Sequence, residues 1–264
     1  MGKIVFSDID GTLLNSEHKV TPHTQSAIRQ LQDRDIPFVI VSARSPSAIY
    51  PILKEYEFNC PIISYSGGLI LDEDRNVLYH KGIPKENAQK IIDFIEKQRW
   101  DMSWGVYSLD EWIVKDKTDP RIVSEENVVK AQSIQGTVDS VTDPEVNKIL
   151  CICNPKQTLM IEQTLKKAFP SCSIVKSSDV LLEIMENGIT KAAAVERLCE
   201  IWGVPVEETI AFGDNYNDVE MLETVGTGVL MGNAPEELKK RFPIQTKDHD
   251  HDGIYEALLK MNLL

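Results

Sequence analysis

The sequence predicts an α/β protein with a parallel sheet, into which an α+β domain is inserted. Apolar strand signals and amphipathic helix signals alternate along both ends of the chain, which is typical of parallel α/β sheets. Several of the apolar strands end in short polar loops. The pattern changes near Gly82-Ile83-Pro84 and returns near Asn187-Gly188, which indicates a second domain joined to the first by two chain crossings.

The opening segment Lys3-Ile4-Val5-Phe6-Ser7 predicts a strand that leads into Asp8, Asp10 and the turn Gly11-Thr12. Residues i and i+2 of an extended chain face the same way, so both carboxylates are expected at one spot. A hard cation such as Mg2+ would relieve their repulsion. The alternative is a plain turn, because Asp and Gly are favoured in turns for their own reasons.

The elements that follow are placed by cap and apolar signals. Thr21-Pro22 combines an N-cap with a proline at the first helical position. A continuous apolar run such as 36–41 predicts a strand buried on both faces. The expected elements are a helix from Thr21-Pro22, a strand over 36–41, a helix from Ser45-Pro46, a strand over 61–65 and a hairpin around 72–76.

The inserted domain is expected over residues 83–187, and the core over 1–82 and 188–264. The elements expected in the inserted domain are helices over 85–99, 119–130 and 155–168, and strands over 104–109, 111–115, 148–153, 173–176 and 181–185. Trp104, Tyr107 and Trp112 either line a ligand site of this domain or belong to its own core. Cys151 and Cys153 lack the spacing of a zinc site, which favours packing in the core.

A core helix over 190–202 closes at Gly203, and a strand over 209–212 leads into Gly213-Asp214-Asn215-Tyr216-Asn217-Asp218. Ligands of open α/β sheets bind outside the carboxyl ends of the strands. We therefore expect these polar groups to share one crevice: Asp8, Asp10, Ser42, Asp214 and Asp218. A helix N-terminal signature is the alternative explanation of the segment 217–218.

Lys191 lies in the first turn of its helix, where the helix dipole disfavours a cation. This position indicates that the lysine neutralises an anionic ligand beside the acidic residues. The alternative is a solvated surface lysine.

The formal net charge of −13 argues against nucleic acid or an anionic membrane surface as partner. The chain contains no apolar run long enough to span a bilayer and does not begin with a signal segment. The five cysteines are scattered, as is typical of reduced, buried thiols. We expect a soluble cytoplasmic protein, and its net charge does not exclude a small anionic substrate. The sequence does not indicate its oligomeric state.

Four segments in this order resemble the motifs of the haloacid dehalogenase (HAD) superfamily: Asp8-Ile9-Asp10-Gly11-Thr12, Ser42, Lys191, and Gly213-Asp214-Asn215-Tyr216-Asn217-Asp218. Three further segments are similar to its Cof-type branch, the sugar phosphatases with a type IIB cap: Met221-Leu222, Met231-Gly232-Asn233-Ala234 and Asp250-His251-Asp252-Gly253-Ile254. The resemblance covers the core, and it implies a Rossmann-like parallel-sheet core with an inserted α+β cap of type C2B.

The resemblance implies a Mg2+-dependent phosphatase that hydrolyses a small phosphorylated metabolite, with a sugar phosphate as the expected substrate. Asp8 would be the nucleophile that forms an aspartyl-phosphate, and Asp10 the general acid and base. Mg2+ would be held by Asp8, the main-chain carbonyl of Asp10, and Asp214.

The same resemblance implies a phosphate-binding set, made of Ile9, Ser42, Ala43, Lys191 and Asn217. Asp218 and Arg44 would support these groups, with Asp218 positioning Lys191 or a metal-bound water.

The chain departs from the family pattern in three places. Ser42-Ala43-Arg44 replaces the usual Thr-Gly-Arg, which keeps the hydroxyl but not the conformational freedom of glycine. Ser66-Gly67-Gly68 stands where Asn-Gly-Ala is frequent, and Lys191-Ala192 replaces Lys-Gly. We therefore expect the catalytic groups to be retained and the specificity to differ.

Two other functions remain open, a phosphotransferase of the phosphomannomutase kind and a noncatalytic protein that binds a phosphorylated metabolite. A dehalogenase is disfavoured, because that chemistry in the family does without the second aspartate that this chain has at Asp10. A P-type pump is excluded by the lack of membrane spans.

Overall fold

The computed structural model describes residues 4–264, so that Lys3 of the predicted opening strand lies outside the described residues. The chain forms two compact units. The first comprises the chain up to Arg44, Tyr50–Tyr79 and Thr190–Leu264, and the second comprises Ser45–Ile49 and His80–Ile189. Among residues 4–264, no helix combines the length and apolar character that a bilayer crossing requires.

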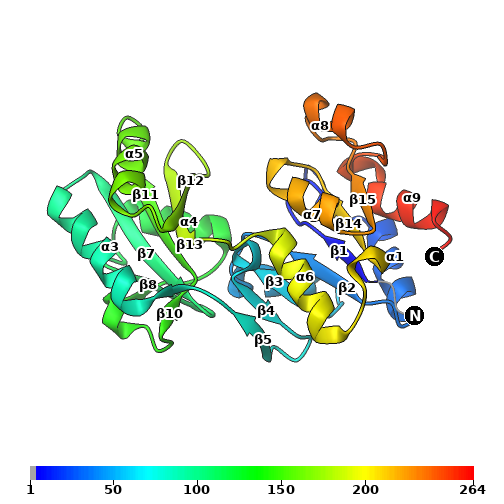
Figure 1. Cartoon of the computed structure of the whole chain (residues 1–264), viewed down its shortest axis with the longest axis horizontal. Helices are drawn as coiled ribbons and strands as arrows, with labels where there is room; N and C mark the ends of the chain where they lie inside the picture. Colours follow the sequence, from blue (N-terminus) through cyan, green and yellow to red (C-terminus); the bar gives the residue numbers. More distant parts are fainter. Residues whose placement is uncertain (1–3) are drawn as a thin grey trace. The chain divides into compact units, whose positions relative to one another are not determined.

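The sheet of the first unit has seven strands in the order β15-β14-β1-β2-β3-β4-β5 (Figure 1). The strands are β1 Val5–Ser7, β2 Phe38–Val41, β3 Ile62–Ser64, β4 Leu69–Leu71, β5 Val77–His80, β14 Ile210–Gly213 and β15 Thr227–Leu230. Neighbouring strands from β15 to β3 are parallel, and β4 runs antiparallel to β3. The predicted parallel sheet is confirmed. In it, β1 lies between β2 and β14, although β14 is far from β1 in the sequence.

The α-helices of this unit are α1 Pro22–Gln32, α6 Lys191–Trp202, α7 Val219–Thr224, α8 Glu236–Arg241 and α9 Gly253–Lys260. The helix α2 Pro46–Glu55 is divided, since its first turn belongs to the second unit and the rest to the first. Short 3-10 turns are η1 Tyr65–Gly67, η3 Val206–Glu208, η4 Tyr216–Asp218 and η5 His249–His251. The predicted N-cap is present, since the Thr21 side chain accepts a hydrogen bond from the amide of Thr24. Thr190, expected within its helix, is instead the N-cap and accepts a hydrogen bond from the amide of Ala193, and α6 ends at Gly203 as predicted. The turn of the predicted hairpin closes between Asp72 and Asn76.

A buried apolar cluster joins α6, α7 and α8 to one face of this sheet. On α6, Ala194, Val195 and Leu198 pack with Phe6 and Val39 of the strands. Side chains alternate along a strand, so the intervening strand residues point to the other face, where α1 contacts β2 and α9. The core therefore fixes α6 against the sheet, with its first residue at the carboxyl edge of β1.

The second unit has a six-stranded sheet in the order β12-β13-β11-β7-β8-β9. Its strands are β7 Met102–Ser108, β8 Glu111–Val114, β9 Ile134–Gln135, β11 Lys148–Cys153, β12 Cys172–Lys176 and β13 Leu181–Glu186. A separate pair is formed by β6 Ile83–Pro84 and β10 Glu145–Val146. The helical segments are α3 Lys85–Gln98, α4 Pro120–Val129, α5 Thr158–Ala168 and η2 Val138–Ser140. Only β8 and β9 pair in parallel among the described strands of this sheet.

The core of the second unit lies between this sheet and the helices α3 and α5. Trp104, Cys151 and Cys153 belong to it, which confirms the prediction that both cysteines pack in a core. Tyr107 and Trp112 stack with ring centroids 5.1 Å apart, and they are 4% and 2% exposed. All three aromatic residues are therefore packed inside the unit.

Candidate active site

The candidate site lies at the carboxyl edge of the parallel sheet of the first unit. Asp8 follows β1, Asp214 follows β14, and Lys191 is the first residue of α6. The chain leaves β1 toward β2 on one side, whereas β14 pairs with β1 on the other side. Such a switch point opens a crevice in which open α/β sheets bind ligands.

Lys191 forms the centre of the site. Its Nζ lies 2.5 Å from Asp8 Oδ1 and 2.5 Å from Asp218 Oδ1, and the residue is only 2% exposed. Burial acts to lower the pKa of Lys191, but the charges of Asp8 and Asp218 outweigh it and raise the pKa. The alternative of a solvated surface lysine is therefore wrong, and the two carboxylates explain a cation in the first turn of a helix.

Asp218 is fully buried and uses both carboxylate oxygens. Oδ1 accepts a hydrogen bond from Lys191 Nζ. Oδ2 accepts hydrogen bonds from the backbone amides of Asp214 at 3.0 Å and Asn215 at 3.1 Å. Asn215 also begins a capping box with Asp218. The helix-cap signature and the positioning of Lys191 are thus properties of the same side chain.

Three carboxylates converge at this place. Asp8, Asp214 and Asp218 each offer an oxygen, and these oxygens lie within 4.8 Å of one another. Burial raises the pKa of Asp8 to about 7, although Lys191 acts in the opposite direction. Burial, together with the charge of Asp218, raises the pKa of Asp214 to about 6. The single lysine therefore leaves part of the negative charge uncompensated.

Asp10 does not join this cluster, so the expectation that both aspartates crowd one spot is wrong. β1 ends at Ser7, and the chain turns before Asp10, so the alternation of an extended strand does not apply. The Asp10 side chain is 54% exposed and pairs with Arg44 through Nε at 2.9 Å and Nη2 at 2.5 Å. Its charge is the smallest of the causes that raise the pKa of Asp8.

Gly11 allows the chain to pass close to Asp214. Its φ is +82°, and a Cβ there would lie 2.4 Å from Asp214 Oδ2. The left-handed backbone and this close approach both require glycine.

Ser42 is buried after β2, and its Oγ accepts the amide of Arg44 at 3.2 Å. Ala43 is not among the described residues with positive φ, so glycine is not needed there. Ser66, which stands at the usual asparagine position, has φ 54° and ψ 21° and donates its amide to the carbonyl of Ser42 at 2.9 Å. The loops after β2 and β3 are thus joined through their backbones.

Two other predicted site residues lie beside the cluster without joining it. Ile9 is fully buried, and only its backbone is expected to serve the site. Asn217 is exposed on η4, and within residues 4–264 its side chain makes no hydrogen bond to the clustered carboxylates.

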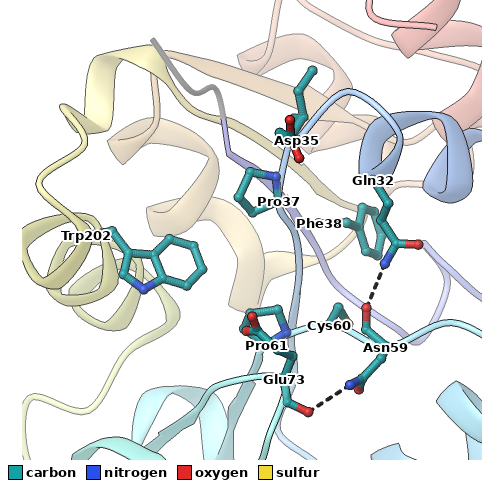
Figure 2. Close-up of a pocket in the computed structure, with 10 residues that line it drawn as sticks. Gln32, Asp35, Pro37, Phe38, Asn59, Cys60, Pro61, Glu73 and Trp202 are labelled. Atoms are coloured by element: carbon teal, nitrogen blue, oxygen red, sulfur yellow. Dashed lines mark hydrogen bonds between the residues drawn. The ribbon is translucent and has the colours of Figure 1, made fainter.

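A pocket of about 430 Å³ lies at the opposite edge of the same sheet, where the parallel strands begin (Figure 2). Phe38 at the start of β2, Pro61 before β3 and Trp202 at the end of α6 line it. None of the predicted site residues is among its described lining residues. We therefore assign the chemistry to the carboxylate cluster and not to this pocket.

A family model described as haloacid dehalogenase-like hydrolase matches residues 5–258. The chain belongs to this family. The hydrolase is 37% identical over 254 residues to a protein of Haemophilus influenzae, with 96% of each chain covered. It is 27% identical to the HMP-PP phosphatase of Serratia proteamaculans, covering 92% of this chain and 88% of that protein.

A solved structure of a haloacid dehalogenase-like hydrolase from Bacteroides thetaiotaomicron superimposes with a TM-score of 0.89 at 29% identity, covering 99% and 100% of the two chains. The family resemblance and the fold class inferred from the motifs are therefore confirmed.

Two residues of the hydrolase were missed as site residues. Thr12 Oγ1 donates to Asp214 Oδ1 at 3.1 Å, and Asn233 Nδ2 lies 3.2 Å from Asp214 Oδ2. Both lie within segments that carry the family resemblance, which is the signal that could have found them. Their roles depend on contacts between residues distant in the sequence.

Replacing Lys191 by Met should lower the free energy of unfolding by about 3–5 kcal/mol, because two buried carboxylates lose their counter-ion. The acids then have folded-state pKa values further above their unfolded values, so the loss should grow as pH rises from about 5 to about 8. Denaturant unfolding at both pH values measures it.

Lys19→Met is the matched control, since that lysine pairs with Glu17 at the surface and both side chains are more than 60% exposed. Its effect should stay within about 0.5 kcal/mol. An equally small effect of Lys191→Met would contradict the central role of the buried lysine.

Proposed function

We propose that the protein is a Mg2+-dependent phosphatase that hydrolyses a small phosphorylated metabolite through an aspartyl-phosphate on Asp8. The observation that carries this proposal is Lys191, held between Asp8 and Asp218 beside the carboxylate of Asp214. A nucleophilic carboxylate, a buried cation and a divalent-cation site in one crevice suit transfer of a phosphoryl group. The name of the Serratia relative, a phosphatase, supports the same reaction class.

The carboxylate cluster fits a divalent cation. Asp8, Asp214 and Asp218 bring three negative charges when ionised, and Lys191 neutralises one. Carboxylate oxygens are the ligands that Mg2+ prefers. Asp8 and Asp214, with the main-chain carbonyl of Asp10, would hold the ion, and the ion would supply positive charge to the phosphoryl oxygens.

In the first half-reaction an Asp8 carboxylate oxygen attacks phosphorus, and the bond from phosphorus to the ester oxygen breaks. Asp10, carrying a proton, donates it to the leaving oxygen. In the second half-reaction Asp10 takes a proton from water, whose oxygen attacks phosphorus and releases the Asp8 carboxylate with inorganic phosphate. The hydrogen bonds from the Arg44 guanidinium would stabilise the ionised form of Asp10, which is the form that accepts the proton.

The phosphate-binding groups are proposed to be Ser42, Lys191, Asn217 and the backbone near Ile9 and Ala43. Ser42 Oγ already accepts the Arg44 amide, which leaves its hydroxyl proton for a phosphoryl oxygen. Lys191 would contribute its charge without moving from its carboxylates. Most of the rate enhancement would then come from positioning and electrostatic stabilisation.

We further propose that residues 83–187 act as the cap that selects the leaving group, with a sugar phosphate as the first substrate class to screen. The Serratia relative is named for HMP-PP, which broadens the screen to other phosphorylated metabolites. Trp104, Tyr107 and Trp112 are buried in the packing of this unit, so its polar residues are the better specificity candidates.

Asp8→Asn should abolish Mg2+-dependent release of phosphate from p-nitrophenyl phosphate, by about a thousandfold or more, because the nucleophile is lost. Circular dichroism checks that the fold is retained. Activity of this variant comparable to the parent would sink the assignment. Product analysis with and without a sugar acceptor separates hydrolysis from phosphoryl transfer.

Asp10→Asn should retain substrate binding and lower turnover by about 100- to 10,000-fold for esters with poor leaving groups. The loss should be smaller for p-nitrophenyl phosphate, whose leaving group needs little protonation. Measuring kcat for p-nitrophenyl and alkyl phosphates tests this difference. Equal losses for both esters would argue against Asp10 as the general acid.

Mg2+ should stabilise the fold more at about pH 8 than at about pH 5.5. Asp8 and Asp214 have pKa values raised from 3.8 to about 7 and about 6, so without the cation stability falls as pH rises through this window. Below it, protons compete with the cation for the same oxygens. The gain in Tm with 10 mM Mg2+ should be about 5 °C at the higher pH.

Thermal unfolding with Mg2+ and with EDTA measures this gain, and Asp214→Asn serves as the control that should lose it. An equal gain at both pH values, or an undiminished gain in the variant, would rule out the carboxylate cluster as the Mg2+ site.

A further inference from the structure

Asn233 lies in the loop between β15 and α8, and its side chain joins three segments of the first unit. Nδ2 donates to the carbonyl of Gly11 at 2.8 Å and to Asp214 Oδ2 at 3.2 Å. Oδ1 accepts the amide of His249 at 3.2 Å. The side chain therefore connects the loop after β1, the loop after β14 and the C-terminal loop.

The three partners determine which way the amide group of Asn233 points. The carbonyl of Gly11 only accepts hydrogen bonds, and the amide of His249 only donates one. Nitrogen toward Gly11 and oxygen toward His249 is thus the single orientation that satisfies both. In this orientation the nitrogen also faces the carboxylate of Asp214.

Asp214 is consequently held at both oxygens. Thr12 donates to Oδ1 at 3.1 Å, and Asn233 donates to Oδ2 at 3.2 Å. Each carboxylate oxygen has two lone pairs, so one hydrogen bond at each oxygen leaves a lone pair for a cation. The two donors fix the plane of the carboxylate without consuming its capacity to bind.

We propose that Asn233 is a positioning residue that sets the orientation of the Asp214 carboxylate for a divalent cation. The proposal rests on the proposed function only in taking Asp214 as a cation ligand. It goes beyond it in assigning control of cation affinity to the loop after β15. Residues that orient metal ligands typically change metal affinity or activity by about 10- to 100-fold when replaced.

The C-terminal loop enters the same arrangement. The amide of Gly232, next to Asn233, donates to the carbonyl of Lys247 at 3.2 Å, and His249 donates to Asn233 itself. One hydrogen bond thus attaches this loop to Asn233 itself, and a second attaches it to the neighbouring Gly232. Loss of Asn233 should therefore act on the cation site, whereas Asp8 and Lys191 keep their own contacts.

The test compares the parent with Asn233→Leu, which keeps a similar volume and removes all three hydrogen bonds. Mn2+ is the probe, and its binding to the full chain is titrated by electron paramagnetic resonance without substrate. The dissociation constant of Mn2+ should rise by about 10- to 100-fold. With p-nitrophenyl phosphate, the Mg2+ activation constant should rise similarly, whereas KM at saturating Mg2+ should change by less than about twofold.

Asn15→Ala is the matched control. Asn15 is also half-buried in the loop after β1, and its Oδ1 accepts the amides of Glu17 and Lys19, away from Asp214. This variant should bind Mn2+ as the parent does. Asn233→Ser, which removes less of the side chain, provides a second measurement if the leucine variant does not fold.

Unchanged Mn2+ affinity in a folded Asn233 variant would overturn the proposal, and so would a rise in KM without a change in cation affinity. A parent that binds Mn2+ but hydrolyses no phosphate ester would instead refute the phosphatase function. The binding titration would still decide the role of Asn233, so the two failures can be told apart.

Discussion

The buried ion pairs of Lys191 place the strongest demand on the architecture of this protein. Removing an ammonium and two carboxylates from water costs several kcal/mol per ion, and only close, well-directed contacts offset this cost. The required partners come from the end of β1 and from η4, and the lysine itself comes from α6. These three elements must therefore meet within hydrogen-bond distance, which leaves little tolerance in how the sheet and the helix pack.

The apolar core, which lies away from the charged groups, fixes the positions of the elements that carry them. Ala194, Val195 and Leu198 fix α6 on the sheet, so that the first residue of the helix is held beside Asp8. Asp218 adds local rigidity, because it binds two backbone amides as well as the lysine. Packing thus sets the position of the Lys191 ammonium group, and hydrogen bonds set the orientation of the Asp218 carboxylate.

Local signals made most of the fold predictable from the sequence. Thr21 caps α1 and Gly203 ends α6 as expected, because helix caps depend on residues only a few positions away. Continuous apolar runs likewise revealed β2, β3 and β14 within one or two residues. The helices α7, α8 and α9 and the strand β15 were not assigned in advance; the sequence after Asp218 was interpreted only through its resemblance to a family.

The site was predictable in composition but not in detail. The meeting of Asp8, Asp214 and Lys191 follows from strand order and helix position, which the alternating pattern implies. The direction of Asp10 does not, because it depends on where β1 ends and on an arginine 34 positions away. Thr12 donates a hydrogen bond to Asp214, which lies 202 positions further along the chain. A contact between residues so far apart cannot be predicted from the periodicity of the sequence.

The central place of β1 also has a consequence during synthesis. One neighbour, β2, is made soon afterwards, but β14 begins only at Ile210. At roughly 5–20 residues per second, β1 waits on the order of 10–40 s on the ribosome with one edge unpaired. An apolar strand with an open edge is a template for wrong pairing. Until β14 has been made, the open edge of β1 is therefore accessible to such wrong pairing.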